Sequence, residues 1–289
     1  MVVEEKLQRL EATLEKMGSL LVAFSGGVDS TFLLKVAYDC LGDNVIAVTA
    51  NSDTYSSQEL VEAKGFAEAL GVRHMIIDSE ELHIQGFREN TPQRCYYCKQ
   101  ELFSRLKGIA RRENVAWVAD GTNSDDTGDY RPGMKAAAEL GVRSPLKEAG
   151  LTKEEIRRLS KKMGLPTWDK PPLACLASRF PYGTEITREE LRRVGEAEKL
   201  LRNRGIRTVR VRHHGHIARI EVGVKEMARF FEPDFRTEVI EELKRLGYLY
   251  VALDLEGYRS GSMNEVLNPE EKLQPQRHRD TENWYGGDG

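Results

Sequence analysis

The sequence contains few cysteines, no long apolar run and little net charge. Four of its 289 residues are cysteine, at positions 40, 95, 98 and 175, which excludes a disulfide-dense secreted scaffold. No window approaches the roughly 18 apolar residues of a membrane span, and the charged N-terminal segment lacks the cleavage site of a secretory signal. The formal net charge of −3 gives no general basic field for nucleic acid. We therefore expect a cytoplasmic protein without membrane contact, in which a cysteine pair binds metal or does redox chemistry more readily than it forms a structural disulfide.

The first half of the chain alternates between strand and helix patterns. The apolar runs at 19–24, 44–50, 72–78 and 115–120 predict strands, and the segments 30–41 and 56–71 have helical spacing. Strands separated by helices of this length predict an α/β fold with a doubly wound parallel sheet. Ligands bind such sheets beyond the carboxyl ends of the strands.

The second half has a different pattern. Prolines at 171, 172 and 181 interrupt the periodicity, which places a domain boundary at 168/169. A helix at 187–205, strands at 207–214 and 217–222, a helix near 234–246 and a strand at 248–255 predict a smaller α+β domain over 169–265. The polar, aperiodic stretch 266–289 predicts a disordered tail.

The string SGGVDS, residues 25–30, lies directly between the first predicted strand and the first predicted helix. Free backbone N–H groups and the helix dipole favour an anion there, and the two glycines allow the backbone to approach it closely. No lysine follows the glycines as it does in the G-x-x-x-x-G-K-[ST] loop. The candidate anion-binding residues are Ser25, Gly26, Gly27, Ser30 and Thr31; the alternative is a tight turn without a ligand.

This string resembles the loop of the PP-loop ATP pyrophosphatases. The resemblance implies that the loop grips the β,γ-pyrophosphate of ATP, that ATP is cut between its α- and β-phosphates, and that Asp29 works through Mg²⁺. It further implies nucleotide contacts at Ala50, Ser52, Gly121 and Thr122, with Asp125 as a second candidate Mg²⁺ ligand. For the segment 119–126 the alternative is a polar turn.

Three further segments, 131–146, 169–187 and 209–222, resemble one subfamily of these enzymes, the LarE-type sulfur transferases that help make the nickel-pincer nucleotide of lactate racemase. The similarity runs from about residue 5 to 260. It implies that a carboxylate of pyridinium-3,5-biscarboxylic acid mononucleotide is adenylated by ATP and then converted to a thiocarboxylate. The partners that we expect are this small nucleotide, a sulfide donor and further copies of the chain.

Cys95 and Cys98 are three residues apart in a predicted helix that Thr91 and Pro92 would begin. They therefore share a helix face in the first turns, where the dipole favours thiolates. The resemblance makes Cys175 the segment's reactive sulfur, and three cysteines can hold a four-iron, four-sulfur cluster with one iron left open for sulfide. The alternatives are a zinc site completed by a histidine, and a redox pair with a separate, sacrificial Cys175. Cys40 is expected to be a small buried residue.

Arg210 and Arg212 are two apart on a predicted strand, so they project from one face and suit a phosphate; the alternative is a solvated face. The resemblance adds four polar positions around the substrate, Ser178, Arg179, Glu198 and Glu221. A tRNA thiolase is the alternative function, but the chain has no aromatic-rich basic surface for RNA. A nucleotide sensor with a degenerate loop is a second alternative, although such a loop would have lost Asp29.

Overall fold

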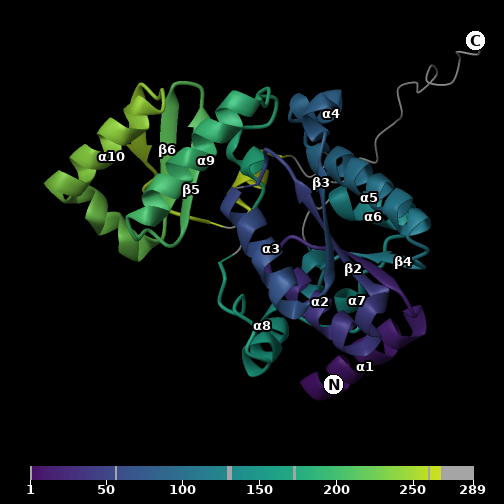
Figure 1. Cartoon of the computed structure of the whole chain (residues 1–289). Coiled ribbons are helices and arrows are strands. Elements are labelled where there is room, and N and C mark those ends of the chain that lie inside the picture. Colours follow the sequence, from purple (N-terminus) through teal and green to yellow (C-terminus); the bar gives the residue numbers. More distant parts are fainter. Residues whose placement is uncertain (1, 56, 129–131, 172–173, 260, 268–289) are drawn as a thin grey trace, which may run out of the picture. The chain divides into compact units, whose positions relative to one another are not determined.

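The computed structural model describes residues 2–55, 57–128, 132–171, 174–259 and 261–267. The chain divides into two units, residues 1–258 and 259–289. All of the following helices and strands belong to the first unit. Figure 1 labels most of them. The elements are, in order, α1 (Val3–Met17), β1 (Leu20–Ala23), α2 (Val28–Leu41), β2 (Val45–Asn51), α3 (Ser57–Leu70), β3 (Arg73–Asp78), α4 (Gln85–Arg88), α5 (Arg94–Arg112), β4 (Trp117–Ala119), α6 (Pro132–Glu139), α7 (Pro145–Glu148), α8 (Lys153–Lys162), α9 (Arg188–Asn203), β5 (Val209–His214), β6 (Ile217–Val222), α10 (Pro233–Arg245) and β7 (Tyr250–Leu253).

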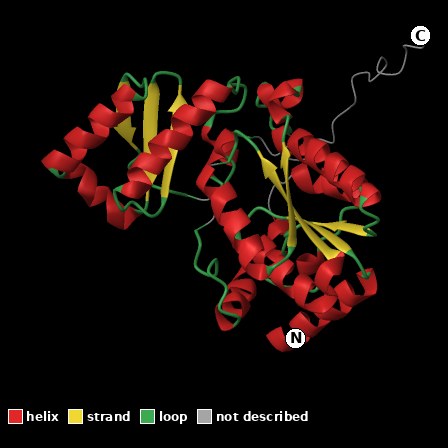
Figure 2. Ribbon diagram, in the orientation of Figure 1, coloured by secondary structure: helices red, strands yellow, loops and turns green. Residues whose placement is uncertain are grey.

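The larger sheet has the strand order β3-β2-β1-β4, and all of its pairs are parallel. Because successive side chains of a strand point to opposite faces, β1 and β2 supply two separate cores. Leu20 and Val22 pack with α1, α2 and α8, whereas Leu21 and Ile46 pack with α5 and α6. Helices therefore cover both faces of the sheet (Figure 2), and the predicted doubly wound α/β fold is confirmed.

The smaller sheet has the order β5-β6-β7 and carries α9 and α10 on its apolar face. Strands β5 and β6 are antiparallel, and β7 joins β6 in parallel. Val209 and Val211 enter the core with α9, so the intervening Arg210 and Arg212 point to the opposite face. This alternation presents charged side chains on one face of the smaller sheet.

One local prediction is wrong. Thr91 does not cap the helix that carries the cysteine pair, because its hydroxyl donates to the carbonyl oxygen of Gly86 (3.3 Å). The helix α5 instead begins at Arg94, with Gln93 at the N-cap and no side-chain capping bond. Cys95 and Cys98 still lie in its first turns, so their shared face is retained.

Two predictions concern segments that the structure describes only in part. Pro172 and the tail from residue 268 onward lie outside the described residues, and the domain boundary at 168/169 stays a prediction. Among the described residues, every helix is either too short or too polar to cross a bilayer.

Candidate active site

The SGGVDS loop connects β1 to the first turn of α2. Gly26 has a positive φ of 69°, and a Cβ there would come within 3.1 Å of the Ala63 Cβ. The Ser25 and Ser30 hydroxyls lie 3.1 Å apart, and Ser30 donates to the carbonyl oxygen of Gly27 (3.2 Å). Hydroxyl bonds across the turn and a glycine in the left-handed region thus hold the loop in a tight bend at the helix N-terminus.

Two polar atoms of this helix start find no hydrogen-bond partner among the described residues. They are the Thr31 hydroxyl and Oδ1 of Asp29, and both are buried. The other carboxylate oxygen of Asp29 pairs with Lys153 at the start of α8. Burial raises the pKa of Asp29, and the nearby Lys153 ammonium opposes that rise. Buried polar groups are normally bonded, so these atoms indicate a place for a polar or cationic ligand.

Asp125 lies near the same lysine. The backbone N–H of Lys153 donates to Oδ2 of Asp125 (2.8 Å), while its side chain reaches Asp29. The two carboxylates predicted to bind Mg²⁺ therefore both contact one residue. The buried, unbonded oxygen of Asp29 fits a divalent cation, which prefers carboxylate oxygens.

The predicted second nucleotide turn, Gly121 and Thr122, follows β4 beside the loop. A Cβ at Gly121 would lie 2.9 Å from the backbone nitrogen of Ser30, so only glycine allows this approach. The Thr122 hydroxyl donates to Asp120 (2.8 Å), which also accepts from the Ser144 hydroxyl (2.8 Å). Because β1 and β4 are neighbouring parallel strands, their carboxyl ends lie at the same edge of the sheet, and the two predicted nucleotide-binding segments follow them there.

The end of β2 carries two of the predicted nucleotide contacts, and the chain just beyond it contacts the Cys175 segment. Ala50 is half-buried on β2, and the Ser52 hydroxyl donates to the buried carboxylate of Glu81. The Thr54 hydroxyl also donates to Glu81 (3.2 Å). The backbone N–H of Leu176 donates to the Thr54 carbonyl oxygen (2.8 Å), which fixes the Cys175 segment to this strand end.

The three predicted cluster cysteines lie in one neighbourhood. Burial raises the pKa of the Cys98 thiol strongly, and the charges of Cys175 and Cys95 add to that rise. Burial also raises the pKa of Cys175, and the positive charge of the Arg94 guanidinium opposes that rise. Cys95 is exposed, whereas Cys98 and Cys175 are half-buried against an apolar cluster that includes Phe87 and Leu176.

The three thiols match an iron–sulfur cluster in number and in ligand type, since thiolates are the usual ligands of such clusters. Across the described part of the chain, however, no group of three or more His, Cys, Asp or Glu side chains is arranged to hold a metal ion. The cluster therefore stays a proposal. Cys40 is only half-buried against the main core, so the expectation of a fully buried residue is wrong.

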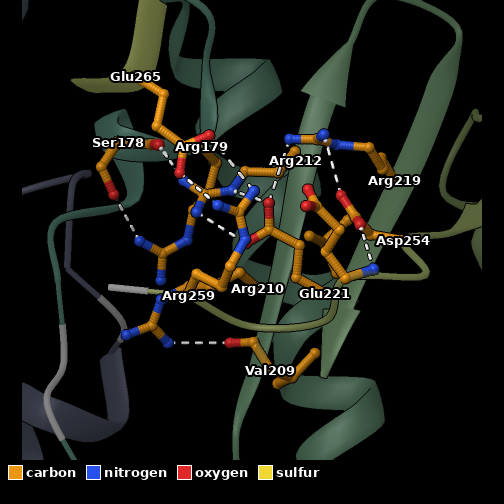
Figure 3. Close-up of polar contacts among 12 residues, drawn as sticks. Ser178, Arg179, Val209, Arg210, Arg212, Arg219, Glu221, Asp254, Arg259 and Glu265 are labelled. Carbon is orange, nitrogen blue, oxygen red and sulfur yellow. Dashed lines mark hydrogen bonds and ion pairs between the residues drawn. The ribbon is translucent and has the colours of Figure 1, made fainter. Parts of the chain in front are cut away.

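Figure 3 shows Ser178, Arg179, Arg210, Arg212 and Glu221 close together, around the turn 176–179 and strands β5 and β6. Glu198 of α9, the sixth residue predicted to surround the substrate, accepts from the Arg179 guanidinium. Arg179 and Glu198 form a fully buried ion pair (2.6 Å), and Arg212 pairs with Glu221 (2.7 Å) while donating to the Ser178 carbonyl oxygen (2.7 Å). Burial lowers the pKa of Arg210 to about 10, with the neighbouring Arg179 charge adding to the effect. Arg210 and Arg212 are 5% and 8% exposed, so a solvated face is wrong.

A cavity of about 780 Å³ reaches both regions. Its lining includes Gly26 and Thr31 from the loop region and Arg210 and Tyr258 from the second half of the chain. Lys170 also lines it, and its ammonium donates to the Gly26 carbonyl oxygen (3.0 Å). The volume lies within the usual range for small-molecule sites.

Comparisons with known proteins place the chain among PP-loop proteins. The family model of the queuosine biosynthesis protein QueC matches residues 19–92. A Lactiplantibacillus plantarum protein named pyridinium-3,5-bisthiocarboxylic acid mononucleotide synthase is 44% identical over 263 residues, covering 91% of this chain and 95% of that protein. The chain belongs to the LarE-type family of PP-loop sulfurtransferases.

Other relatives of this LarE-type chain differ in coverage. An uncharacterized Synechocystis protein is 45% identical over 266 residues, covering 92% of this chain and 99% of its own length. The Rickettsia felis tRNA-specific 2-thiouridylase MnmA is 28% identical over 194 residues, covering only 54% of this chain and 53% of that enzyme. The likeness to the L. plantarum synthase therefore spans nearly the whole chain, whereas the likeness to the thiouridylase is partial.

Sequence reasoning missed several residues of this LarE-type site. Lys153 and Lys170 reach the loop from segments more than 120 residues away, and Arg94 and Glu81 border the Cys175 segment. A lone lysine or glutamate carries no local signal. Only the fold brings these side chains to the site.

Proposed function

We propose that this protein inserts sulfur into pyridinium-3,5-biscarboxylic acid mononucleotide at the expense of ATP. The observation that carries the proposal is the cavity that both the loop residues Gly26 and Thr31 and the sheet residue Arg210 line. Such a cavity can present an acceptor carboxylate to ATP while the acceptor's phosphate lies by the arginines. The printed name of the L. plantarum relative supports the choice of acceptor.

In the first step an oxygen of the acceptor carboxylate attacks the α-phosphorus of ATP. The bond to the β-phosphate breaks, pyrophosphate leaves and an acyl-adenylate remains. The loop, with the helix N-terminus behind it, holds the β,γ-phosphates as one leaving unit. Asp29 and Asp125 would hold Mg²⁺, which neutralises charge on the phosphates when bound. Ala50, Ser52, Gly121 and Thr122 border the adenosine.

In the second step hydrosulfide attacks the acyl carbon, AMP leaves, and a proton is released as the thiocarboxylate forms. Adenylation is required because hydroxide leaves a carboxylate poorly, whereas AMP leaves readily. Cys95, Cys98 and Cys175 would hold a four-iron, four-sulfur cluster, which would supply a binding place for sulfide. The protein contributes the buried surroundings that Phe87 and Leu176 provide, which limit competing hydrolysis of the adenylate.

Ser178, Arg210, Arg212 and Glu221 are the proposed acceptor contacts. Arg212 and Glu221 are already paired, so the guanidinium is held in one orientation before any ligand arrives. Arg179 and Glu198 are buried against each other, and we assign them the role of holding this charged face in place.

The experiment that tests the proposal is analysis of anaerobically reconstituted protein before and after turnover with ATP, acceptor and sulfide. We expect about four irons and four labile sulfides per chain, the content of one such cluster, with all three cysteines intact after several turnovers. Dehydroalanine at position 175 would instead identify a sacrificial thiol and overturn the cluster as sulfur carrier. A zinc content of about one per chain without sulfide would support the structural zinc alternative.

A further inference from the structure

Asn90 lies in the turn between α4 and α5, and Arg94 is the first residue of α5, directly before Cys95. Their side chains are enclosed, with 0% and 4% of the residue surface exposed. Burying a guanidinium is unfavourable unless its N–H groups are bonded, so the partners of Arg94 indicate which segment it holds.

These partners belong to the segment that follows Cys175. The Arg94 guanidinium donates to the carbonyl oxygen of Ala177 (2.8 Å) and to the side-chain oxygen of Asn90. The Asn90 amide donates to the carbonyl oxygens of Phe180 (3.2 Å) and Pro181 (2.7 Å). The two side chains therefore bind three backbone carbonyls of one loop.

The backbone of Asn90 adds a further bond to this loop. Its carbonyl oxygen accepts from the N–H of Gly183 (3.0 Å). Asn90 has a positive φ of 52°, a left-handed conformation that asparagine adopts more readily than most residues. The turn before α5 is thus built around contact with residues 177–183.

A second anchor holds the other side of the same segment. Leu176, the residue after Cys175, donates through its N–H to the carbonyl oxygen of Thr54 (2.8 Å), three residues beyond the end of β2. Cys175 is therefore held between a strand end of the larger sheet and the helix that carries the other two cysteines.

We propose that Asn90 and Arg94 are positioning residues that hold the Cys175 segment against α5, so that Cys175 and the Cys95/Cys98 pair can act on one bound group. Neither residue touches the acceptor or ATP in this assignment. That the bound group is an iron–sulfur cluster rests on the proposed function. That Asn90 and Arg94 hold the Cys175 segment against α5 does not depend on it.

The test measures the closure in apo protein with dibromobimane, a short reagent that links two nearby thiols. Peptide mapping gives the amount of Cys98–Cys175 product, and the Cys95–Cys98 product within α5 serves as an internal reference. A general loss of folding lowers both products or the thermal midpoint, whereas loss of positioning lowers their ratio alone.

In Arg94→Met we expect the ratio to fall about tenfold, as loss of hydrogen bonds from a charged group predicts. Asn90→Ala should lower it about fivefold, and Arg94→Lys should recover part of the loss because it keeps the charge and a donor. Arg88→Met is the matched control. Arg88 lies in α4, close in sequence to Asn90 and Arg94, and its side chain makes an exposed ion pair with Glu185.

An unchanged ratio in both Arg94→Met and Asn90→Ala overturns the proposal, as does the absence of any Cys98–Cys175 product in the unmodified protein. If Arg94→Met does not fold, Asn90→Ala and Arg94→Lys decide the question. A fall in the ratio in a protein that never binds iron would leave the positioning role intact and refute the cluster, so the two proposals fail separately.

Discussion

The loop after β1 and the charged face of β5 and β6 differ in how they treat buried polar groups. At the loop, Oδ1 of Asp29 and the Thr31 hydroxyl are buried with no partner among the described residues. At the charged face, Arg179 of the turn 176–179 and Arg212 of β5 are buried with carboxylates already bound to them. The loop thus has buried polar atoms that a ligand can bond. On the charged face, by contrast, the carboxylates already bond the arginines and hold them in place.

This comparison predicts the largest stability effect at the buried pair of Arg179 and Glu198. Arg179→Met leaves Glu198 buried without its main partner, which should lower the free energy of unfolding by about 3–5 kcal/mol. The surface pair of Arg188 and Asp53 is the control, and Arg188→Met should cost less than about 1 kcal/mol. Urea unfolding of both variants measures the difference; equal losses would remove the contrast between buried and exposed pairs.

The next largest effect is expected at the loop. Asp29→Asn should reduce conversion of ATP to AMP and pyrophosphate by about 10²–10³-fold, the scale of one lost electrostatic contact to the transition state. Asp43→Asn, in the exposed turn after α2, is the control. Stability should change little or rise, because the substitution removes a buried charge. If Asp29→Asn retained most of the ATP turnover, the role of Asp29 in ATP cleavage would be refuted.

A smaller effect is expected in acceptor binding. Arg212→Gln should weaken binding of the acceptor nucleotide about ten- to a hundredfold through loss of a charge-assisted phosphate contact, while ATP binding stays the same. Arg192→Gln, on the exposed side of α9, should change neither. Calorimetric titration of each ligand separates the two sites. A loss of affinity for tRNA with a steep salt dependence would favour the thiolase alternative instead.

The smallest effect concerns pH. Burial lowers the pKa of His213, which packs against Phe180 and Tyr248 and lies 3.3 Å from Glu190. The folded protein therefore binds this proton less readily than the unfolded chain does. The stabilising contribution of the neutral imidazole is complete above about pH 6.5, the ordinary histidine pKa, and is lost as the pH falls through the lower pKa of the folded protein.

His213→Phe should flatten the decline of the unfolding free energy below about pH 6.5. His83→Phe, at an exposed position on the first half of the chain, is the control. Denaturation curves from the neutral range down to mildly acidic pH measure both. An identical slope in all three proteins would show that His213 does not contribute.

Local patterns predicted the loop and the sheets because the physics there is local. Leu20, Leu21 and Val22 alternate between two cores, and Gly26 takes the positive φ that a tight strand-to-helix turn requires. The helix start before Cys95 was misplaced, since the Thr91 hydroxyl binds Gly86 rather than a free N–H of α5. Capping depends on where the preceding chain lies, which spacing alone does not encode.

Long-range pairing accounts for what the sequence pattern missed. Lys153 meets Asp29 across 124 residues, and Arg94 meets Ala177 across 83. The sequence indicated Arg210 and Arg212 as a pair on one face, but not that each would be buried. Such contacts follow from packing the elements together rather than from any one of them.

The most direct test of the proposed sulfur insertion is a balance of products from one reaction containing the protein, ATP, Mg²⁺, sulfide and pyridinium-3,5-biscarboxylic acid mononucleotide. We expect one AMP and one pyrophosphate for each acceptor oxygen replaced by sulfur, with no ATP cleavage when the acceptor is omitted. Formation of ADP as the main product, or an acceptor mass unchanged after AMP has accumulated, would contradict this function.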